Sequence, residues 1–239
     1  MHNIQENPRV PENTENHPHA PQVKICGLTR VHEAVTCASL GADAIGLVFY
    51  PKSPRAVTLE QAKTISLALP LTVCRVGVFV NENYDTILQT AGTARLQAVQ
   101  LHGMESPALV EKLGAQGLTV IKALFSHREP LFTTAGHYPA AAFIVECGVG
   151  PLPGGNAEAW DVSLIKDFAK DFPLVLAGGL TMDNVAHAIN QGQPDAVDIS
   201  SGVERRPGIK DLFKVKQFIA ATQNNPLGKP NRRIFYDNQ

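Results

Sequence analysis

The stretch AIGLVFYPKSPRAVTLEQAKTISLALP, residues 44–70, contains the repeating unit of the fold. Its first six residues form a continuous apolar run, which is typical of a strand covered on both faces rather than on one. A loop with two prolines follows, and apolar residues then recur at helical spacing from residue 58 to residue 70. The stretch therefore predicts a buried strand followed by a helix.

The same order of strand and helix repeats along the chain. Comparable apolar runs begin at residues 23, 73, 98, 119, 141, 174 and 196, and helical spacing recurs between them. With the run at 44 this makes eight units, and continuous apolar strands indicate a parallel sheet. We therefore predict a single (β/α)₈ TIM barrel over residues 22–222, because such barrels typically have about 250 residues. Only the fifth unit is irregular, since residues 125–139 contain two prolines, and its helix is expected to be short.

The two ends of the chain differ in composition from the barrel. Residues 1–21 are rich in Asn, Glu, Pro and His and contain few large apolar residues. Such a segment buries too little apolar surface to offset the entropy of ordering, so it is expected to be a flexible extension. Residues 223–239 are polar and contain prolines, and we expect a second flexible tail there.

Composition narrows the classes of partner. The net charge is −1 with no long cationic run, which argues against nucleic acid and against an anionic membrane surface. The apolar runs are too short to cross a bilayer, and the first twenty residues lack an apolar secretory segment. Four widely spaced cysteines form no C-x-x-C pair, which favours free thiols. These features predict a cytoplasmic protein and leave a small anionic substrate possible.

Two glycine- and serine-containing turns follow the last two strands. In a barrel the loops after the strands face a common site, and small residues there let a phosphate approach backbone N–H groups. One such turn could serve only to reverse the chain, but two at adjacent strand ends favour a phosphate site. The candidate phosphate-binding residues are Gly178, Gly179, Ser200, Ser201 and Gly202.

Cys26 ends the first strand and is the candidate proton-transfer group. A thiolate at a strand end would face the mouth of the barrel, and nearby positive charge would lower its pKa. The alternative is a small buried hydrophobe, which is the usual fate of a free cysteine. Cys37 and Cys74 are assigned to that alternative, and Cys147 is left open.

The loop after the second strand offers a cation at the same mouth. Arg55 lies beside two prolines that stiffen the loop, and a fixed guanidinium suits a carboxylate. Lys52 would act as a mobile point charge, and a solvated loop charge is as plausible for it.

Six strings occur at these strand ends in a fixed order: KICGLTR, GADAIGLVFYPKSPRAVT, VGVFVN, QLHG, LAGGLTMDNV and AVDISSGVE with PGIKD. Together they closely resemble the phosphoribosylanthranilate isomerases of tryptophan biosynthesis, from residue 23 to about residue 220. The resemblance implies a monomeric or homodimeric (β/α)₈ barrel that uses no cofactor and no metal. It also implies an isomerase that converts N-(5-phosphoribosyl)anthranilate, an aminoaldose, to 1-(2-carboxyphenylamino)-1-deoxyribulose 5-phosphate by an Amadori rearrangement.

The resemblance also implies roles for the candidate residues. An Amadori rearrangement needs an acid to open the ribose ring and a base to remove a proton from the adjacent carbon. By resemblance Cys26 is the base, Arg55 holds the anthranilate carboxylate or a neighbouring charge, and Asp198 contacts the sugar hydroxyls. The small residues of the two turns would hold the phosphate. His102 in QLHG lines the mouth in the family pattern, although a purely structural histidine is an equal alternative.

The chain departs from the family pattern at the acid. The family ends its sixth strand with Asp, followed by G-G-T-G, whereas this chain has Glu146 there and Asn156 and Ala157 in place of the Thr-Gly. Glutamate has the same proton chemistry, so Glu146 is the candidate acid, with Asp161 as the fallback.

A small misplacement of the acid at Glu146 would lower the rate steeply, so a second hypothesis is a phosphosugar-binding barrel with impaired catalysis. A third is the related aminoaldose isomerase of histidine biosynthesis. That family usually has two catalytic aspartates and duplicated phosphate loops, which Cys26 and the absence of a half-barrel repeat disfavour.

Overall fold

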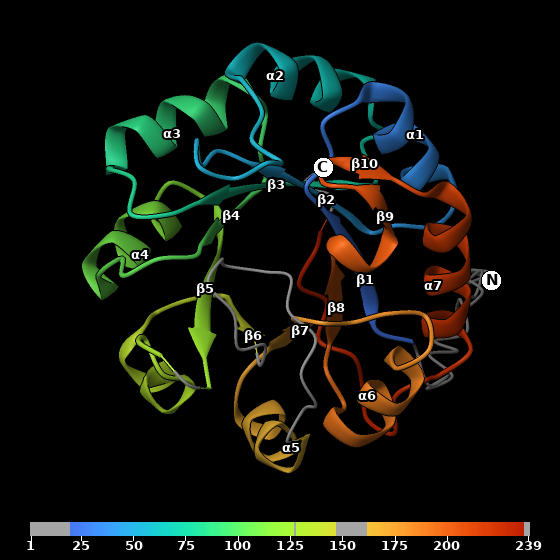
Figure 1. Cartoon of the computed structure of the whole chain (residues 1–239). Helices are drawn as coiled ribbons and strands as arrows, with labels where there is room; N and C mark the ends of the chain where they lie inside the picture. The colour runs from blue at the N-terminus through green and yellow to red at the C-terminus, as the bar shows by residue number, and fades with distance from the viewer. Residues whose placement is uncertain (1–19, 127, 147–161, 237–239) are drawn as a thin grey trace, which may run out of the picture.

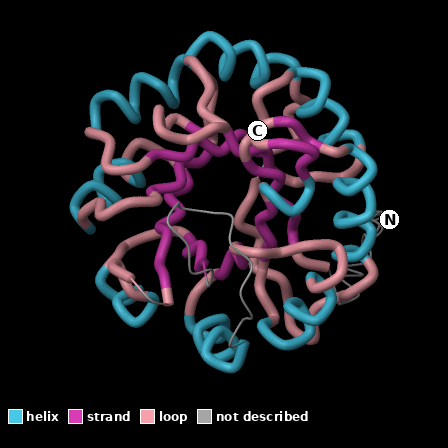
Figure 2. The backbone as a smooth tube through the Cα atoms, viewed as in Figure 1, coloured by secondary structure: helices cyan, strands magenta, loops and turns pink. Residues whose placement is uncertain are grey.

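The computed structural model describes residues 20–126, 128–146 and 162–236 (Figure 1). Eight parallel strands form a closed barrel in sequence order, each paired to the next, with the last paired to the first. The tube view shows them as one ring inside a ring of helices (Figure 2). This confirms the predicted (β/α)₈ barrel. The strands are β1 (Gln22–Cys26), β2 (Ala44–Val48), β3 (Cys74–Phe79), β4 (Ala98–Leu101), β5 (Thr119–Phe125), β6 (Ala142–Glu146), β7 (Leu174–Ala177) and β8 (Ala196–Ile199).

The helices follow the strands as predicted. They are α1 (Val31–Ser39), α2 (Leu59–Ala68), α3 (Tyr84–Thr93), α4 (Pro107–Gly114), α5 (Val162–Asp171), α6 (Val185–Gly192) and α7 (Leu212–Gln223). Several begin at side chains that accept from otherwise unpaired N–H groups, such as Thr58 in a capping box with Gln61. The fifth unit has only a 3₁₀ helix, η1 (Phe132–His137), which confirms its irregularity.

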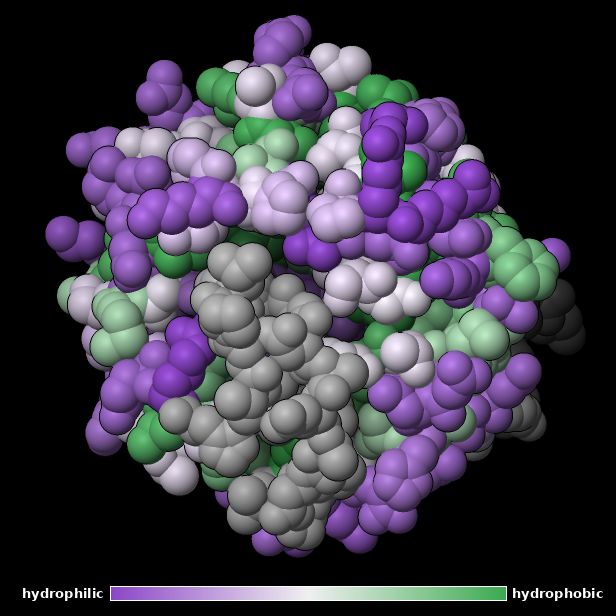
Figure 3. Space-filling view, viewed as in Figure 1, coloured by the Kyte–Doolittle hydropathy of each residue, from purple (hydrophilic) through white to green (hydrophobic). Residues whose placement is uncertain are grey.

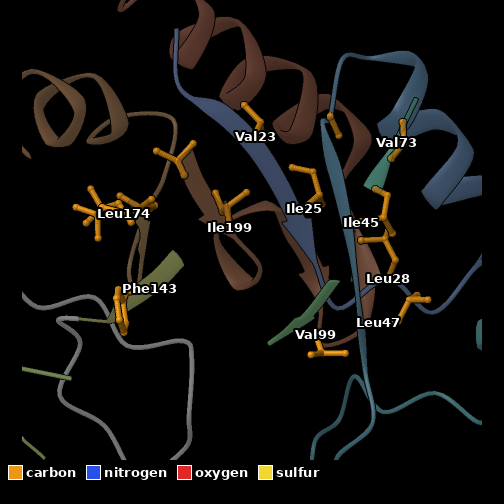
Figure 4. Close-up of a cluster of buried hydrophobic side chains, with 14 of the residues drawn as sticks. Val23, Ile25, Leu28, Ile45, Leu47, Val73, Val99, Phe143, Leu174 and Ile199 are labelled. Carbon is orange, nitrogen blue, oxygen red and sulfur yellow. The ribbon is translucent and has the colours of Figure 1, made fainter. Parts of the chain in front are cut away.

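Alternation along each strand separates two cores. Val23 and Ile25 of β1 face outward and join the large core between strands and helices, part of which is shown in Figure 4. The inward positions form a second core, dominated by alanine, valine and isoleucine. These small inward side chains leave room for Lys24, which is fully buried. Cys26, an inward position at the carboxyl end of β1, lies above this core and lines the barrel mouth.

A short hairpin interrupts the last unit. After β8 the chain forms a 3₁₀ turn, η2 (Ser201–Val203), and two antiparallel strands, β9 (Glu204–Arg206) and β10 (Ile209–Lys210). Gly208 lies between them with φ +78°, a conformation that favours glycine. The hairpin places Glu204 and Lys210 beside the barrel mouth.

The C-terminal segment corrects one prediction. A flexible tail was expected from residue 223, but α7 continues to Gln223 and the residues up to 236 pack against the amino ends of the strands. Ile234 and Phe235 are buried in the inner core, where its small side chains leave space. The side chain of Gln22 accepts from both of their backbone N–H groups and donates to the carbonyl of Phe235. This segment therefore closes the floor of the barrel.

Ion pairs attach the same segment to the barrel wall. Asp195, fully buried just before β8, accepts from Arg232 at 2.8 Å and faces Lys229 at 3.2 Å. The amide of Asn231 donates to the carbonyl of Ala20, at the start of the described chain. The predicted extension at residues 1–21 lies almost wholly outside the described residues, and its flexibility stays a prediction.

We predict that Phe235→Ala lowers the free energy of unfolding by about 3–5 kcal/mol, because it removes a buried aromatic side chain and leaves a cavity. Urea denaturation measures this loss. Tyr236→Ala is the matched control: Tyr236 is half exposed, so its loss should change stability by no more than about 0.5 kcal/mol. Equal effects of the two substitutions would contradict the closed floor.

Candidate active site at the carboxyl ends of the strands

A pocket opens at the carboxyl ends of β1, β2, β3, β4, β6 and β8. The space-filling view shows hydrophilic residues over much of the visible face, with paler and hydrophobic residues among them (Figure 3). Six of the residues predicted from sequence line the pocket, namely Cys26, Arg55, His102, Glu146, Asp198 and Ser200. A second hollow adjoins it, and the other four candidates, Gly178, Gly179, Ser201 and Gly202, line that hollow. Glu146, Asp198 and Ser200 line both, so the structure brings all ten candidates together.

Cys26 lies beside a buried ion pair. The Lys24 ammonium lies 2.9 Å from Oδ1 of Asp198 and is fully buried. Burial raises the pKa of the Cys26 thiol and outweighs Lys24, which lowers it, so the pKa lies above its ordinary value. Burial lowers the pKa of Lys24, but Asp198 and Cys26 raise it by more than burial lowers it, so the pKa of Lys24 lies above its ordinary value. Cys26 therefore rests as a thiol next to a permanent cation that would stabilise its thiolate.

Space for the thiol comes from the neighbouring strand. Gly46 of β2 pairs in register with Cys26, and a Cβ at position 46 would lie 2.6 Å from Sγ of Cys26. No other residue fits there without displacing the thiol. Cys37 and Cys74 are buried away from the pocket lining, and burial raises the pKa of each to about 12, as expected for structural cysteines.

Glu146 ends the sixth strand, lines the same pocket as Cys26 and has a histidine neighbour. Nε2 of His102 lies 3.4 Å from Oε2 of Glu146, and Nδ1 of His102 lies 2.9 Å from the amide of Gln100. Burial raises the pKa of Glu146, but His102, Arg128 and Lys24 lower it more, and the pKa lies below its ordinary value. Glu146 therefore rests as a carboxylate.

Two residues near Glu146 were missed by the sequence analysis. Gln100 precedes His102 by two positions on β4, and strand alternation alone could have placed both on the inner face. Arg128 lies in the loop after β5, with its guanidinium carbon 3.2 Å from the centroid of the Phe125 ring. Phe125 in turn packs edge-on against His102. Residue spacing carries no signal for Arg128, because its position depends on the path of an irregular loop.

Arg55 is held by an acidic residue that the sequence analysis did not assign. Its Nε and Nη2 donate to the two carboxylate oxygens of Glu204 at 2.9 and 2.8 Å. Lys210 donates to the same carboxylate at 2.9 Å. Burial raises the pKa of Glu204, but these two cations lower it more, so its pKa lies below the ordinary value. The guanidinium is thus fixed, and part of its hydrogen-bonding capacity is already used.

The two small-residue turns are packed against each other. Gly178 and Gly179 have φ of +90° and +66°, which favours glycine. A Cβ on Gly202 would clash with the carbonyl oxygen of Leu180, so the second turn can approach the first only because residue 202 is glycine. The hydroxyl of Ser200 donates to the carbonyl of Cys26 at 3.1 Å, which ties the second turn to β1.

Asp161, Cys147, Asn156 and Ala157 lie outside the described residues, so the predictions made for them stay predictions. In the part of the chain that the structure describes, no three His, Cys, Asp or Glu side chains group in a way that could hold a metal ion. Over the same residues no helix is long and apolar enough to cross a membrane.

The model of the family described as N-(5'phosphoribosyl)anthranilate (PRA) isomerase matches residues 23–221. The chain belongs to this family. The N-(5'-phosphoribosyl)anthranilate isomerase of Desulfatibacillum aliphaticivorans is 47% identical over 214 residues, covering 90% of this chain and 98% of that relative. The isomerase of Pseudomonas syringae pv. tomato is 44% identical over 204 residues, covering 84% and 97%.

Solved structures of phosphoribosylanthranilate isomerases are similar as well. The enzyme from Thermotoga maritima superposes with a TM-score of 0.80 at 42% identity, over 85% of this chain and 99% of that one. A phosphoribosylanthranilate isomerase in complex with reduced 1-(o-carboxyphenylamino)-1-deoxyribulose 5-phosphate superposes with a TM-score of 0.75 at 42% identity, over the same shares. The similarity covers the barrel and nearly the whole length of these relatives.

We predict that Glu204→Gln destabilises the protein by about 3 kcal/mol at neutral pH. The reason is that Arg55 and Lys210, which are both shielded from solvent, lose the negative charge that pairs with them. The pKa of Glu204 is lowered in the folded state, so its contribution is complete above the ordinary glutamate pKa of ~4.3 and is lost as the pH falls through the folded value. Denaturation of both proteins between pH 7 and pH 3 should therefore show the difference shrinking in acid. Glu111→Gln, at an exposed position of α4, should change stability by less than about 0.5 kcal/mol throughout.

Proposed function

We propose that the protein catalyses the Amadori rearrangement of N-(5'-phosphoribosyl)anthranilate to 1-(2-carboxyphenylamino)-1-deoxyribulose 5-phosphate, a step of tryptophan biosynthesis. The observation that carries the proposal is one pocket lined by both Cys26 and Glu146 that adjoins a hollow of small residues after β7 and β8. Membership of the isomerase family supports it, as does the similarity to an isomerase solved with a reduced product.

The acid and the base divide the reaction into two proton transfers. Protonated Glu146 gives its proton to the ribose ring oxygen, the bond from that oxygen to the anomeric carbon breaks, and the anthranilate nitrogen forms a protonated Schiff base. Cys26 as thiolate then takes the proton from the adjacent carbon, and the electron pair forms an enolamine that tautomerises to the ketone. Atoms and electrons balance within the substrate, so the reaction is an isomerisation.

The rest of the pocket fits the rest of the substrate. The phosphate would lie in the second hollow, among Gly178, Gly179, Ser200, Ser201 and Gly202. Asp198 would accept from the sugar hydroxyls, and its ion pair with Lys24 fixes its position. The aromatic ring would pack on Val48, Val78 and Tyr50, with its carboxylate toward Arg55 or Lys52 at the same rim. In this arrangement Glu204 determines which N–H groups Arg55 presents to the carboxylate.

The setting of the protein is proposed on the same grounds. Among the described residues Cys26, Cys37 and Cys74 are free, and a catalytic thiolate needs a reducing compartment, which supports a cytoplasmic location. The catalytic domain is residues 22–222 together with the packed segment up to residue 236. It works as a monomer or a homodimer. The isomerase of Thermotoga maritima is dimeric, and the structure of monomers generated from it has been solved.

We expect Glu146→Gln to lower kcat by about 10²–10⁴-fold, because an amide cannot supply the proton and general acids contribute about that much. Glu146→Asp keeps the proton and should retain most of the activity. Turnover is measured by chromatographic separation of the aminoaldose from the aminoketose. Tight binding of the reduced product by the parent, with turnover of neither isomer, would instead support the impaired phosphosugar-binding barrel.

Cys26→Ser should remove turnover while leaving the fold intact, because a hydroxyl is far less acidic than a thiol. Cys37→Ala is the matched control, since Cys37 lies on α1 outside the pocket lining. Full activity of Cys26→Ser would eliminate the thiol as the base.

The pKa directions predict the pH profile. The productive enzyme carries thiolate and carboxylic acid, whereas the raised pKa of Cys26 and the lowered pKa of Glu146 make thiol and carboxylate the dominant pair. The productive form arises when one proton moves from the Cys26 thiol to the Glu146 carboxylate. At any pH between the two pKa values, the free energy of this transfer does not depend on pH. We therefore expect kcat/KM to be flat through neutral pH, to fall in acid below the ordinary glutamate pKa of ~4.3 and to fall in alkali above the ordinary cysteine pKa of ~8.5. A decline near pH 6–7 would contradict these directions.

A further inference from the structure

Gln100 is a buried side chain in the pocket that the proton transfers do not use. It lies on β4, is 2% exposed and lines the pocket beside His102. Its Nε2 is 2.9 Å from Nδ1 of His102, and its Oε1 has no hydrogen-bond partner among the described residues. A buried amide with only one end satisfied needs a reason, because leaving such a group unpaired costs about 1–3 kcal/mol.

The contacts of His102 determine which way the amide points. On its other side, Nε2 of His102 lies 3.4 Å from the Glu146 carboxylate, which only accepts. If Nε2 carried no proton, two lone pairs would face each other at that contact. A neutral ring with its proton on Nε2 has a bare Nδ1, and a bare Nδ1 requires a donor, which is the N–H of Gln100.

We propose that Gln100 is a positioning residue for the acid of the reaction: by donating to Nδ1 of His102 it fixes the imidazole as the tautomer that presents Nε2–H to Glu146. The inference rests on the proposed function for its effect on rate, whereas the tautomer itself is a property of the free protein. Held in this form, His102 directs one oxygen of Glu146 and stabilises the carboxylate left after the proton has moved to the substrate.

The unpaired Oε1 of Gln100 is then free to accept a hydrogen bond from the substrate. Because Gln100 lines the pocket, a bound substrate can bring an O–H or N–H group to Oε1. Such a bond would satisfy the amide completely and would oppose its rotation. The substrate would thereby reinforce the tautomer that the reaction uses.

Nitrogen-15 NMR of the histidine rings tests the tautomer without substrate. Long-range proton–nitrogen spectra of the parent should show His102 protonated on Nε2 alone, with its signals assigned by their loss in His102→Gln. In Gln100→Glu a carboxylate of similar size accepts from Nδ1–H, so the signals should change to the Nδ1–H tautomer or to the doubly protonated ring. A parent ring that already carries a proton on Nδ1, or one unchanged in Gln100→Glu, would overturn the proposal.

Kinetics test the consequence for the acid. In Gln100→Glu and in the uncharged Gln100→Met, kcat should fall at least about tenfold, because a poorly positioned acid loses part of the 10²–10⁴-fold acceleration that a positioned acid supplies. Gln116→Glu adds the same charge at an exposed position after α4 and should leave kcat unchanged. An unchanged kcat in a folded Gln100→Met protein would overturn the positioning role. If the parent itself turns over no substrate, the proposed function fails, whereas the NMR result still decides the tautomer.

Discussion

The buried ion pair between Lys24 and Asp198 is the interaction on which the rest of the site depends. The two residues are register partners on β1 and β8, the strands whose pairing closes the barrel, and Lys24 is fully buried. An ammonium leaves water only when its charge is compensated, so the pair requires β8 to lie beside β1 at this level. It also places a cation beside Cys26 and brings the turn at Ser200 against the end of β1. The same ion pair thus contributes to closure of the barrel and to the electrostatics around Cys26, the proposed base.

The ring of strands could be predicted from sequence, and so could the residues at its mouth. Continuous apolar runs identify buried parallel strands, and a closed parallel barrel brings all the carboxyl ends to one side. Contacts between distant residues could not be predicted. Arg55 meets Glu204 across 149 positions, and Ile234 and Phe235 are two apolar residues in a polar stretch without periodicity. Their burial depends on how much space the inner side chains leave, which becomes known only once the barrel is closed.

Glu146, the proposed acid, differs from the aspartate that the family resemblance led us to expect, and the structure shows what surrounds the longer side chain. Glutamate reaches one methylene farther than aspartate, and in this pocket its carboxylate meets His102, which itself contacts Gln100. A carboxylate with a nearby imidazole and guanidinium is stabilised in its charged form, which opposes its use as an acid. The same neighbours stabilise the charge that forms when the proton leaves. The side chains around Glu146 therefore favour the state after transfer over the state before it.

The closed floor of the barrel has a consequence for how the protein is made. During synthesis the eight strands emerge from the ribosome before residues 232–235. Yet Ile234 and Phe235 fill the inner core and bind Gln22, and Arg232 binds Asp195 just before β8. The environment of β1 is therefore complete only after residue 235 has been added, more than 200 positions later. Contacts between the two ends of a chain slow folding, and exposed cores aggregate. Until residue 235 has been added, the apolar side chains at the amino ends of the strands lack the cover that Ile234 and Phe235 give them.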